Sequence, residues 1–412
     1  MPRFPSKDSI WSEKSRRLLF FSNALISLPG GYAQVVLPIY LKLIGITAVL
    51  VGVLTTISLL ATSVLLIPFG ILSDRYGRRI FLISGGILAA ASWGIMAFTT
   101  DLAFITVSRA LVGIGSALTS APFNAALADV TSDEDRTRTF GFSSFVSQIA
   151  STGGALISGL PEVLQARLQT DLTSSYRPLF LLASLLSLGT AALMLLFKEK
   201  RVKERKAEKF RFRSMKKISS FALTRGLIGF GAGLVIPLFS LWFYLRFGVG
   251  VSVLGPLFAI SNVTLAFAYL ASGRLAATIG SVNSLIICQG LAIVLLAGIP
   301  ELPSYAIVSV LYVARNFLMN MSQPLETSFL MSIVEPEERA SASAMAGTAS
   351  SITRAVSPSL GGYFMSSVSL SLPFYLTAAL YATSTALFYA FFKNVRIPGE
   401  ASVRFRLRLS GS

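Results

Sequence analysis

The composition of this chain excludes most classes of soluble protein. Of its 412 residues, 53% are hydrophobic and only 13% are charged, well below the roughly 25% charged residues of a globular domain. Its mean hydropathy is +0.68, and it contains repeated apolar runs of the roughly 20 residues that a helix needs to cross a bilayer. We therefore predict an all-α integral membrane protein of the cell membrane.

The charged and reactive residues narrow the functional classes. The net charge is +17, but the basic residues lie between apolar runs and at the termini, where an inner membrane leaflet attracts them. We expect contact with membrane lipids and no nucleic-acid partner. The chain has no histidine and one cysteine, Cys288, which excludes histidine-based catalysis and an intramolecular disulfide framework. We expect no enzymatic activity, no metal and no cofactor.

Twelve apolar runs are candidate transmembrane helices. In chain order they are residues 18–42, 47–72, 80–99, 102–127, 140–160, 178–197, 219–246, 252–275, 282–299, 304–328, 340–366 and 373–393. Lys and Arg are concentrated in the short loops of one side and at both termini, which places that side in the cytoplasm. The pattern predicts twelve transmembrane helices with cytoplasmic N- and C-termini.

A basic segment separates the first six runs from the last six. Residues 198–217 hold eleven basic residues and three acids. We predict a six-helix bundle over 1–197, a basic cytoplasmic linker over 198–217 and a second six-helix bundle with a basic tail over 218–412. The linker is either a solvated connection that fixes the topology or a site for lipid headgroups or a partner.

The two halves share an internal repeat at an offset of 203 residues. The aligned pairs are Gly30 and Gly233, Gly45 and Gly248, Gly52 and Gly255, Gly70 and Gly273, Gly77 and Gly280, Arg136 and Arg339, and Gly159 and Gly362. Parallel repeats of this kind are related by an axis along the membrane normal, with a site between them near the midplane. We therefore expect two pseudo-symmetric bundles.

A charged motif follows the second run and carries a family resemblance. Residues 70–79 read GILSDRYGRR and fill the pattern Gly-x-Leu-x-Asp-Arg-x-Gly-Arg-Arg. With two six-span halves and a basic central loop, the chain resembles the major facilitator superfamily. A second pattern of that family, Arg-x-x-x-Gly-x-Gly, is met by Arg109, Gly113 and Gly115. The resemblance implies a monomeric transporter that moves a small-molecule substrate by alternating access.

The resemblance also implies a latch on the cytoplasmic side. Its candidate residues are Gly70, Asp74, Arg75, Gly77, Arg78, Arg79 and Arg136. Asp74 can accept hydrogen bonds from helix N-termini or pair with one of these arginines. The alternative is that the arginines only mark the topology. Residues 273–280, GRLAATIG, keep the glycines and lack the charges, so we predict a plain turn there.

Polar residues within the runs are the candidate substrate-binding or coupling residues, because charge inside a membrane needs a partner or a cavity. They are Arg109, Arg315, Asn316, Asn320, Gln323, Glu326, Arg354, Gln34 and Asn124. Arg109 is either a coupling residue or a structural one, and Arg225 is expected to extend to the surface. The polar strip from Arg315 to Glu326 either lines a cavity or forms hydrogen bonds between helices.

The net positive interior that these residues imply favours an organic anion or amphiphile as substrate. Proton-coupled multidrug efflux is the alternative, although 151–159 lack the proline that family exporters carry in the fifth span and the first span has no acid. A transport-inactive receptor or scaffold is a third hypothesis.

Overall fold

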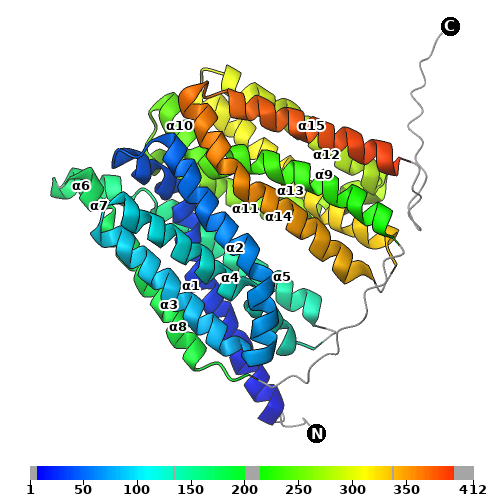
Figure 1. Cartoon of the computed structure of the whole chain (residues 1–412), viewed down its shortest axis with the longest axis horizontal. Helices are drawn as coiled ribbons and strands as arrows, with labels where there is room; N and C mark the ends of the chain where they lie inside the picture. Colours follow the sequence, from blue (N-terminus) through cyan, green and yellow to red (C-terminus); the bar gives the residue numbers. More distant parts are fainter. Residues whose placement is uncertain (1–6, 133–134, 170, 200–213, 336–337, 394–412) are drawn as a thin grey trace. The chain divides into compact units, whose positions relative to one another are not determined.

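The described residues of the computed structural model, 7–132, 135–169, 171–199, 214–335 and 338–393, are helical and contain no β-strand (Figure 1). Most of the predicted linker and of the basic tail lies outside these ranges. The helices are α1 (Lys7–Leu43), α2 (Ala48–Tyr76), α3 (Arg78–Phe98), α4 (Leu102–Asp129), α5 (Arg136–Ile157), α6 (Leu160–Leu168), α7 (Leu172–Ser175), α8 (Arg177–Leu195), α9 (Met215–Val235), α10 (Phe239–Phe247), α11 (Val251–Ile279), α12 (Ser281–Gly298), α13 (Tyr305–Ile333), α14 (Arg339–Ser367) and α15 (Leu372–Phe392), with the 3₁₀ helices η1 (Ile236–Leu238) and η2 (Ile299–Glu301).

Each of the twelve predicted runs lies on helix, and nine spans within the described ranges are long and apolar enough to cross a membrane. The most apolar window of α2 has a mean hydropathy of 2.3 and is only 17% buried, so α2 exposes apolar side chains such as Val64 and Ile67. A water-soluble helix hides such residues. Both observations indicate a multi-pass membrane protein; the number twelve and the orientation stay predictions.

The helix α5 is not among these nine apolar spans, because it carries polar side chains, several of which bind α1. Asn23 Nδ2 donates to the Ser143 carbonyl at 2.9 Å, and one turn further the hydroxyls of Ser27 and Ser147 are 2.7 Å apart. Small residues continue the contact in the next turns, where Gly154 lies against the Leu28 carbonyl. Close approach and hydrogen bonds between helices replace hydrophobic burial as the packing force inside a membrane.

One predicted span is interrupted. The run 219–246 forms α9, then η1, then α10, and the break coincides with Pro237, which has no N–H to donate. In α1, by contrast, Pro29 lies inside a continuous helix. The helix is therefore broken at Pro237 and continuous at Pro29.

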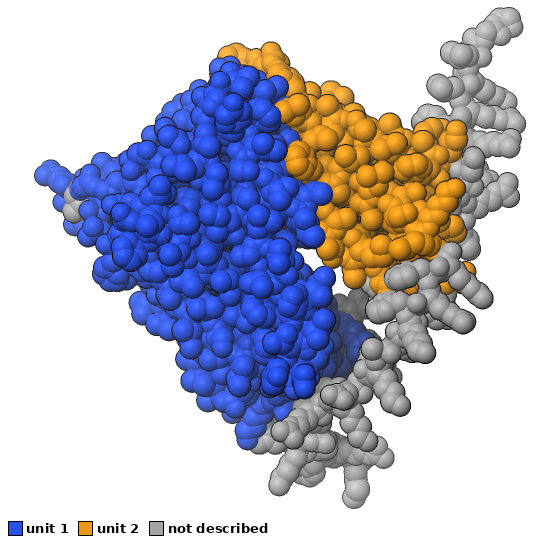
Figure 2. Space-filling view, in the orientation of Figure 1, with its two compact units in different colours: residues 1–208, 232–263, 351–373 blue, residues 209–231, 264–350, 374–412 orange. Residues whose placement is uncertain are grey.

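The chain divides into two compact units (Figure 2). Unit 1 comprises 1–208, 232–263 and 351–373, and unit 2 comprises 209–231, 264–350 and 374–412. In unit 1, α1 packs against α5 and α8, α3 packs between α4 and α8, and α2 lies along α4 (Figure 1). The division into bundles 1–197 and 218–412 stays a prediction.

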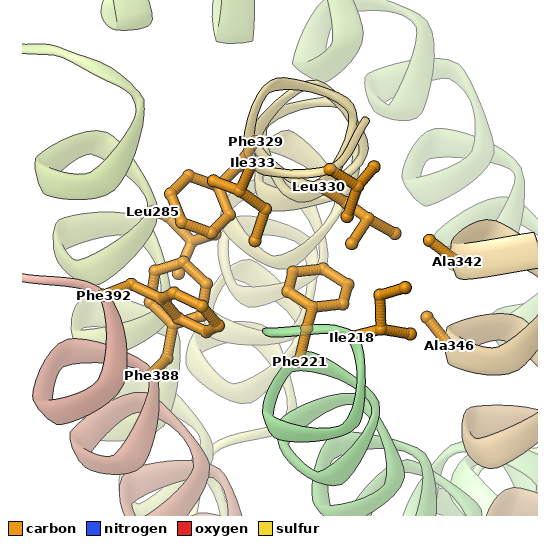
Figure 3. Close-up of a cluster of buried hydrophobic side chains, with 11 residues drawn as sticks. Ile218, Phe221, Leu285, Phe329, Leu330, Ile333, Ala342, Ala346, Phe388 and Phe392 are labelled. Atoms are coloured by element: carbon orange, nitrogen blue, oxygen red, sulfur yellow. The ribbon is translucent and has the colours of Figure 1, made fainter. Parts of the chain in front are cut away.

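Unit 2 has an aromatic core at one end of its helices (Figure 3). The Phe329 ring of α13 lies 5.0 Å from that of Phe388 and 5.1 Å from that of Phe392 on α15, measured between centroids. Phe221 of α9, Leu285 of α12 and, on α14, Ala342 and Ala346 belong to the same cluster. The core therefore fixes α9, α12, α13 and α15 relative to one another within the unit.

The repeat appears in the backbone. The glycines with positive φ in the described residues are Gly45 and Gly248, at 89° and 66°, and Gly77 and Gly280, at 98° and 81°. Each pair is related by the offset of 203 residues. Such φ values favour glycine, and Gly77 and Gly280 each directly precede a helix. Of the segment 273–280, in which a turn was predicted, residues 273–279 are the end of α11 and the turn lies at Gly280.

Two helix contacts of unit 1 are related to each other by the same offset of 203 residues. At Gly52 of α2, an added Cβ would overlap the Pro358 carbonyl of α14, and at Gly255 of α11 it would lie 2.5 Å from the Ala155 carbonyl of α5. The offset that relates Gly52 to Gly255 also relates Ala155 to Pro358. The two repeats therefore make the same glycine-to-carbonyl contact.

The adjacent glycines of α5 provide a matched test of this packing. An added Cβ at Gly153 meets no atom within 4 Å, whereas at Gly154 it would overlap the Leu28 carbonyl. Because alanine favours helix over glycine by about 1 kcal/mol, we expect Gly153→Ala to keep or raise the apparent Tm of the purified protein. Gly154→Ala should lower it. Equal melting temperatures for the two variants would contradict the close approach of α1 and α5.

Candidate functional site

The charged motif forms a tight turn between α2 and α3. Gly77 ends α2 and directly precedes α3, where its φ of 98° suits glycine. An added Cβ would also lie 3.0 Å from Glu199 Oε2. At Gly70, two turns earlier, an added Cβ would make only an ordinary contact with Ala121 of α4. Of these two glycines, Gly77 is therefore the one that the turn requires.

Arg78 is the centre of the ion pairs at this turn. Its Nη2 lies 3.1 Å from Asp74 Oδ1, one turn back along the chain, and its Nη1 pairs with Asp129 at the end of α4. The Arg78 side chain is 12% exposed, whereas that of Asp74 is 64% exposed. The pairing of Asp74 with Arg78, one of the predicted alternatives, is confirmed, and Asp129 was not foreseen.

Two helix ends meet across this turn. Glu199, after α8, accepts hydrogen bonds from the backbone N–H groups of Arg78 at 2.8 Å and Arg79 at 3.3 Å, at the N-terminus of α3. In return, the Arg79 guanidinium donates to the carbonyls of Met194 at 3.2 Å and of Leu195 at the end of α8. Acid at a helix N-terminus and base at a C-terminus both oppose the helix dipole. Arg79 thus joins α3 to α8.

The other two arginines of the predicted latch, Arg75 and Arg136, are exposed. Arg75 lies with its guanidinium carbon 5.6 Å from the centre of the Tyr76 ring, a cation–π contact. Arg136 is the first residue of α5. Asp74, Arg78 and Arg79 of the predicted latch are therefore joined at this turn by the bonds described above.

Arg109 is buried in α4 and has few hydrogen-bond partners among the described residues. It is 8% exposed, and Nη2 donates to the Ser58 hydroxyl of α2 at 3.4 Å. Its Nε and Nη1 have no hydrogen-bond partner among the described residues. One turn on, Gly113 leaves room for the Ser58 carbonyl and Gly115 for the backbone of α3. The Arg-x-x-x-Gly-x-Gly pattern therefore buries a cation between closely packed helices.

Arg315 of α13 is the second buried cation. It is 3% exposed. Its Nη2 donates to the Tyr381 hydroxyl of α15 at 3.2 Å, its Nη1 donates to Asn316 Oδ1 at 3.0 Å, and the guanidinium lies 5.7 Å from the Tyr381 ring centre. Its Nε has no hydrogen-bond partner in the part of the chain that the structure describes. Gly231 makes room for this ring, since an added Cβ would lie 2.9 Å from Tyr381 Cε1.

The polar strip predicted on α13 exists as a hydrogen-bonded ladder that starts at Arg315. Asn320 Nδ2 donates to the Asn316 carbonyl at 2.8 Å, and Gln323 Nε2 donates to Asn320 Oδ1 at 3.2 Å. Asn316 and Asn320 are half-buried and Gln323 is exposed. The ladder therefore runs along an accessible face of an otherwise apolar helix.

A second network crosses unit 2 around Glu326. The Glu326 carboxylate of α13 pairs with Arg225 of α9 and accepts a hydrogen bond from Gln289 Nε2 of α12 at 2.7 Å. Thr385 of α15 donates to Gln289 Oε1 at 2.8 Å. The expectation that Arg225 extends to the surface is wrong, because the buried carboxylate holds its guanidinium.

The aromatic core lies next to this network. On each of the four helices, a core residue stands three or four positions from a network residue, which is one helical turn. The pairs are Phe221 and Arg225, Leu285 and Gln289, Glu326 and Phe329, and Thr385 and Phe388. Tyr381 stands one turn to the other side of Thr385, whose hydroxyl also donates to the Tyr381 carbonyl. The packed core thus holds both the Glu326 network and the contact of Arg315 with Tyr381 in place.

The remaining candidates lie in unit 1 and are exposed. They are Gln34 of α1, Asn124 of α4 and Arg354 of α14. The Gln34 carbonyl accepts a hydrogen bond from Ser240 of α10 at 3.2 Å. The structure brings together Arg315, Asn316, Asn320 and Gln323 along α13, with Tyr381 as the contact that sequence reasoning missed. The only signal for Tyr381 was its four-residue spacing from Thr385 on an apolar run.

Comparisons with known proteins agree with this architecture. The family model described as the Major Facilitator Superfamily matches residues 19–300 and 221–408. The tetracycline resistance protein, class H, of Pasteurella multocida is 34% identical over 117 residues, which are 28% of this chain and 29% of that protein. The quinolone resistance protein NorA of Staphylococcus aureus (strain MRSA252) is 28% identical over 144 residues, 35% of this chain and 36% of NorA. The matches thus span about a third of these relatives.

Solved structures resemble the whole chain. A bacterial homologue of the human lysosomal transporter Spinster, inward-facing and occupied, has a TM-score of 0.76 at 15% identity and covers 94% of this chain and 97% of its own. A mutant of the nucleoside transporter NupG has a TM-score of 0.74 at 14% identity, with 92% and 100% covered. The human organic anion transporter MFSD10 has a TM-score of 0.64 at 16% identity, with 92% and 99% covered. Because the family model spans nearly all of its length, the chain belongs to the Major Facilitator Superfamily.

Proposed function

We propose that this protein is a secondary transporter that moves a small organic anion or anionic amphiphile by alternating access. The observation that carries the proposal is the pair of acid-free buried arginines, Arg109 and Arg315. Neither has an acidic partner among the described residues, whereas the buried Glu326 is already paired with Arg225. The interior charge of the helices is therefore net positive.

The physical argument starts from the free energy of burying a cation. An arginine at the centre of a membrane helix costs about 2.5–3.5 kcal/mol on insertion scales, and it persists where a partner or a water-filled path compensates it. The partners of Arg315 are neutral: a tyrosine hydroxyl, a tyrosine ring and an amide oxygen. A carboxylate supplied by a substrate would compensate the charge, and it can bind a guanidinium through two parallel hydrogen bonds.

The ladder on α13 extends this argument to the rest of a substrate. Asn316, Asn320 and Gln323 offer amide donors and acceptors in series from Arg315 along an accessible helix face. Met319, on the same helix, supplies a flexible apolar side chain between them. A molecule with one carboxylate and a mixed polar and apolar body matches this arrangement.

The same proposal includes the topology. We place twelve transmembrane helices in two six-helix bundles, 1–197 and 218–412, which the cytoplasmic linker 198–217 joins, with both termini in the cytoplasm. What supports it is the charge distribution of the loops and the repeat-related turns at Gly77 and Gly280. Alternating access then interconverts two states of these bundles around one site.

A proton-coupled multidrug exporter is the second candidate. Two observations favour it: the partial similarity to the tetracycline and quinolone resistance proteins, and the buried carboxylate of Glu326, whose hydrogen bonds to Arg225 and Gln289 would rearrange on protonation. A receptor or scaffold without transport activity is the third candidate. Transport by the purified protein in proteoliposomes separates it from the first two.

Substitution of Arg315 tests the anion site. In proteoliposomes we expect the wild type to transport carboxyfluorescein, an organic anion, in preference to ethidium, an organic cation. Arg315→Met removes the charge and should reduce carboxyfluorescein transport at least about tenfold, since hydrogen bonds to charged groups are the strong ones. Arg246→Met, at an exposed arginine in the last turn of α10, is the matched control. Loss of ethidium transport alone in Arg315→Met would contradict the proposal.

Asp74→Asn tests the latch. The Asp74 side chain is 64% exposed, so its pair with Arg78 contributes little to folding, about 0–1 kcal/mol. We expect an unchanged apparent Tm together with slower turnover, because Arg78 loses one of its two acids at the turn. Wild-type transport rates in Asp74→Asn would show that the turn does not act as a latch.

Paired substitutions at Glu326 separate the two transport candidates. Removing one partner of a buried ion pair costs about 3–5 kcal/mol, whereas an apolar replacement of both is often neutral. We expect Glu326→Met to lower the apparent Tm and the double variant Arg225→Met/Glu326→Met to restore it. In the anion transporter the double variant keeps carboxyfluorescein transport. A stable double variant that has lost proton-driven ethidium export would instead favour the multidrug exporter.

A further inference from the structure

Glu162, in the first turn of α6, binds the N-terminus of a helix that begins about 90 residues later. Its Oε1 accepts the Val251 N–H at 2.7 Å, and its Oε2 accepts the Ser252 N–H at 3.2 Å and the Ser252 hydroxyl. These N–H groups belong to the first turn of α11, where the helix itself supplies no acceptor. All four residues of this contact, Glu162, Gly250, Val251 and Ser252, lie in unit 1, and we call them the Glu162 clasp.

The residues around the Glu162 clasp leave room for the carboxylate and add a further hydrogen bond to α11. At Gly250, an added Cβ would overlap Glu162 Oε1, so only glycine leaves room for the carboxylate. The Ser158 hydroxyl donates to the Val251 carbonyl at 3.3 Å. At Gly159, an added Cβ would lie 2.9 Å from the Ser252 Cα atom. The end of α5 and the start of α6 therefore meet the start of α11 through polar groups and glycines.

The repeat shows that the clasp is an addition to the shared architecture. The offset of 203 residues aligns Gly159 with Gly362, and an added Cβ at Gly362 would likewise overlap the backbone at the start of α2, at the Ala48 carbonyl. The same offset aligns Glu162 with Met365, which cannot accept such hydrogen bonds. The start of α2 is capped instead by its own Thr47, whose hydroxyl oxygen lies 3.4 Å from the Leu50 nitrogen. One of two equivalent contacts thus carries a carboxylate that links separate helices.

We propose that Glu162 is a gate residue of the transport cycle, and that release of its carboxylate from the N-terminus of α11 is required to open the end of the protein at which α5 meets α11. This inference rests on the proposed alternating access and adds the residue that sets its equilibrium. The clasp joins a segment of the first repeat to the first turn of a helix of the second. Any state in which these segments separate must therefore leave both backbone N–H groups and the carboxylate to water.

A labelling experiment tests the gate without any substrate. Cys288 is the one cysteine of the chain and is replaced by alanine. A reporter is then introduced as Ser240→Cys, because Ser240 is 1% exposed and its hydroxyl lies between α10 and α1. Residues 248–250 connect α10 directly to α11, so separation of α11 from α6 draws α10 away from α1. The measurement is the rate at which a maleimide labels the full chain in nanodiscs.

We expect Glu162→Ala to raise the labelling rate at least about tenfold, because it removes all three hydrogen bonds that the carboxylate accepts. Glu162→Gln, which keeps one acceptor oxygen, should give an intermediate rate. Glu301→Ala, at an exposed glutamate in a 3₁₀ helix near a helix end, is the control and should leave the rate unchanged. A parental rate in Glu162→Ala overturns the gate. Absence of transport with a raised labelling rate would count against the proposed function and leave the gate intact.

Gly250→Ala supplies a second variant that acts on the same carboxylate from the other side. Its Cβ displaces Glu162 Oε1, so we expect it to raise labelling to the level of Glu162→Ala. In the Glu162→Ala background it should have no further effect, because a double-mutant cycle isolates the shared interaction. If the two substitutions instead raised the labelling rate additively, Gly250→Ala would be acting through strain in the loop. That result would overturn the role of the Glu162 clasp.

Discussion

The constraint on which this structure depends is that lipid offers no hydrogen bond and no counter-charge. Each backbone polar group and each charged group within the lipid must therefore find its partner within the protein or in a water-filled cavity. Three glutamates meet this need in the same way, by accepting backbone N–H groups at or near the start of another helix: Glu199 at α3, Glu162 at α11 and Glu338 at Ser214, just before α9. In each case a carboxylate supplies the acceptor that the start of the helix lacks.

Because of the same constraint, two buried arginines without a carboxylate partner, Arg109 and Arg315, stand out. Arg78, Arg79 and Arg225 each have a carboxylate or helix-end carbonyl groups as acceptors. Arg109 and Arg315 bind neutral groups and keep unpaired N–H groups, within the ranges that the structure describes. The proposed binding of an organic anion rests on this contrast between the paired and the unpaired arginines of the described residues.

Local features of the fold could be predicted from the sequence, because they depend on residues close together along the chain. Apolar length predicted the positions of the helices, the glycine spacing predicted the turn that lies at Gly280, and the residue types from Arg315 to Glu326 predicted a polar strip, although not the hydrogen bonds within α13 that link it. The partners of Arg225 and Arg78 could not be predicted, since Glu326 is 101 residues from Arg225 and Asp129 belongs to another helix. Glu199 appeared in the sequence as one of three acids in a basic run, and only the fold brings it to the start of α3.

The matched contacts of Gly52 with Pro358 and of Gly255 with Ala155 have a mechanical consequence. Each brings two helix backbones together with no side chain between them, so neither contact can stretch by rotating a side chain. Because the repeat makes the two crossings equivalent, a side chain larger than glycine at Gly52 or at Gly255 would have to push one helix backbone away from another.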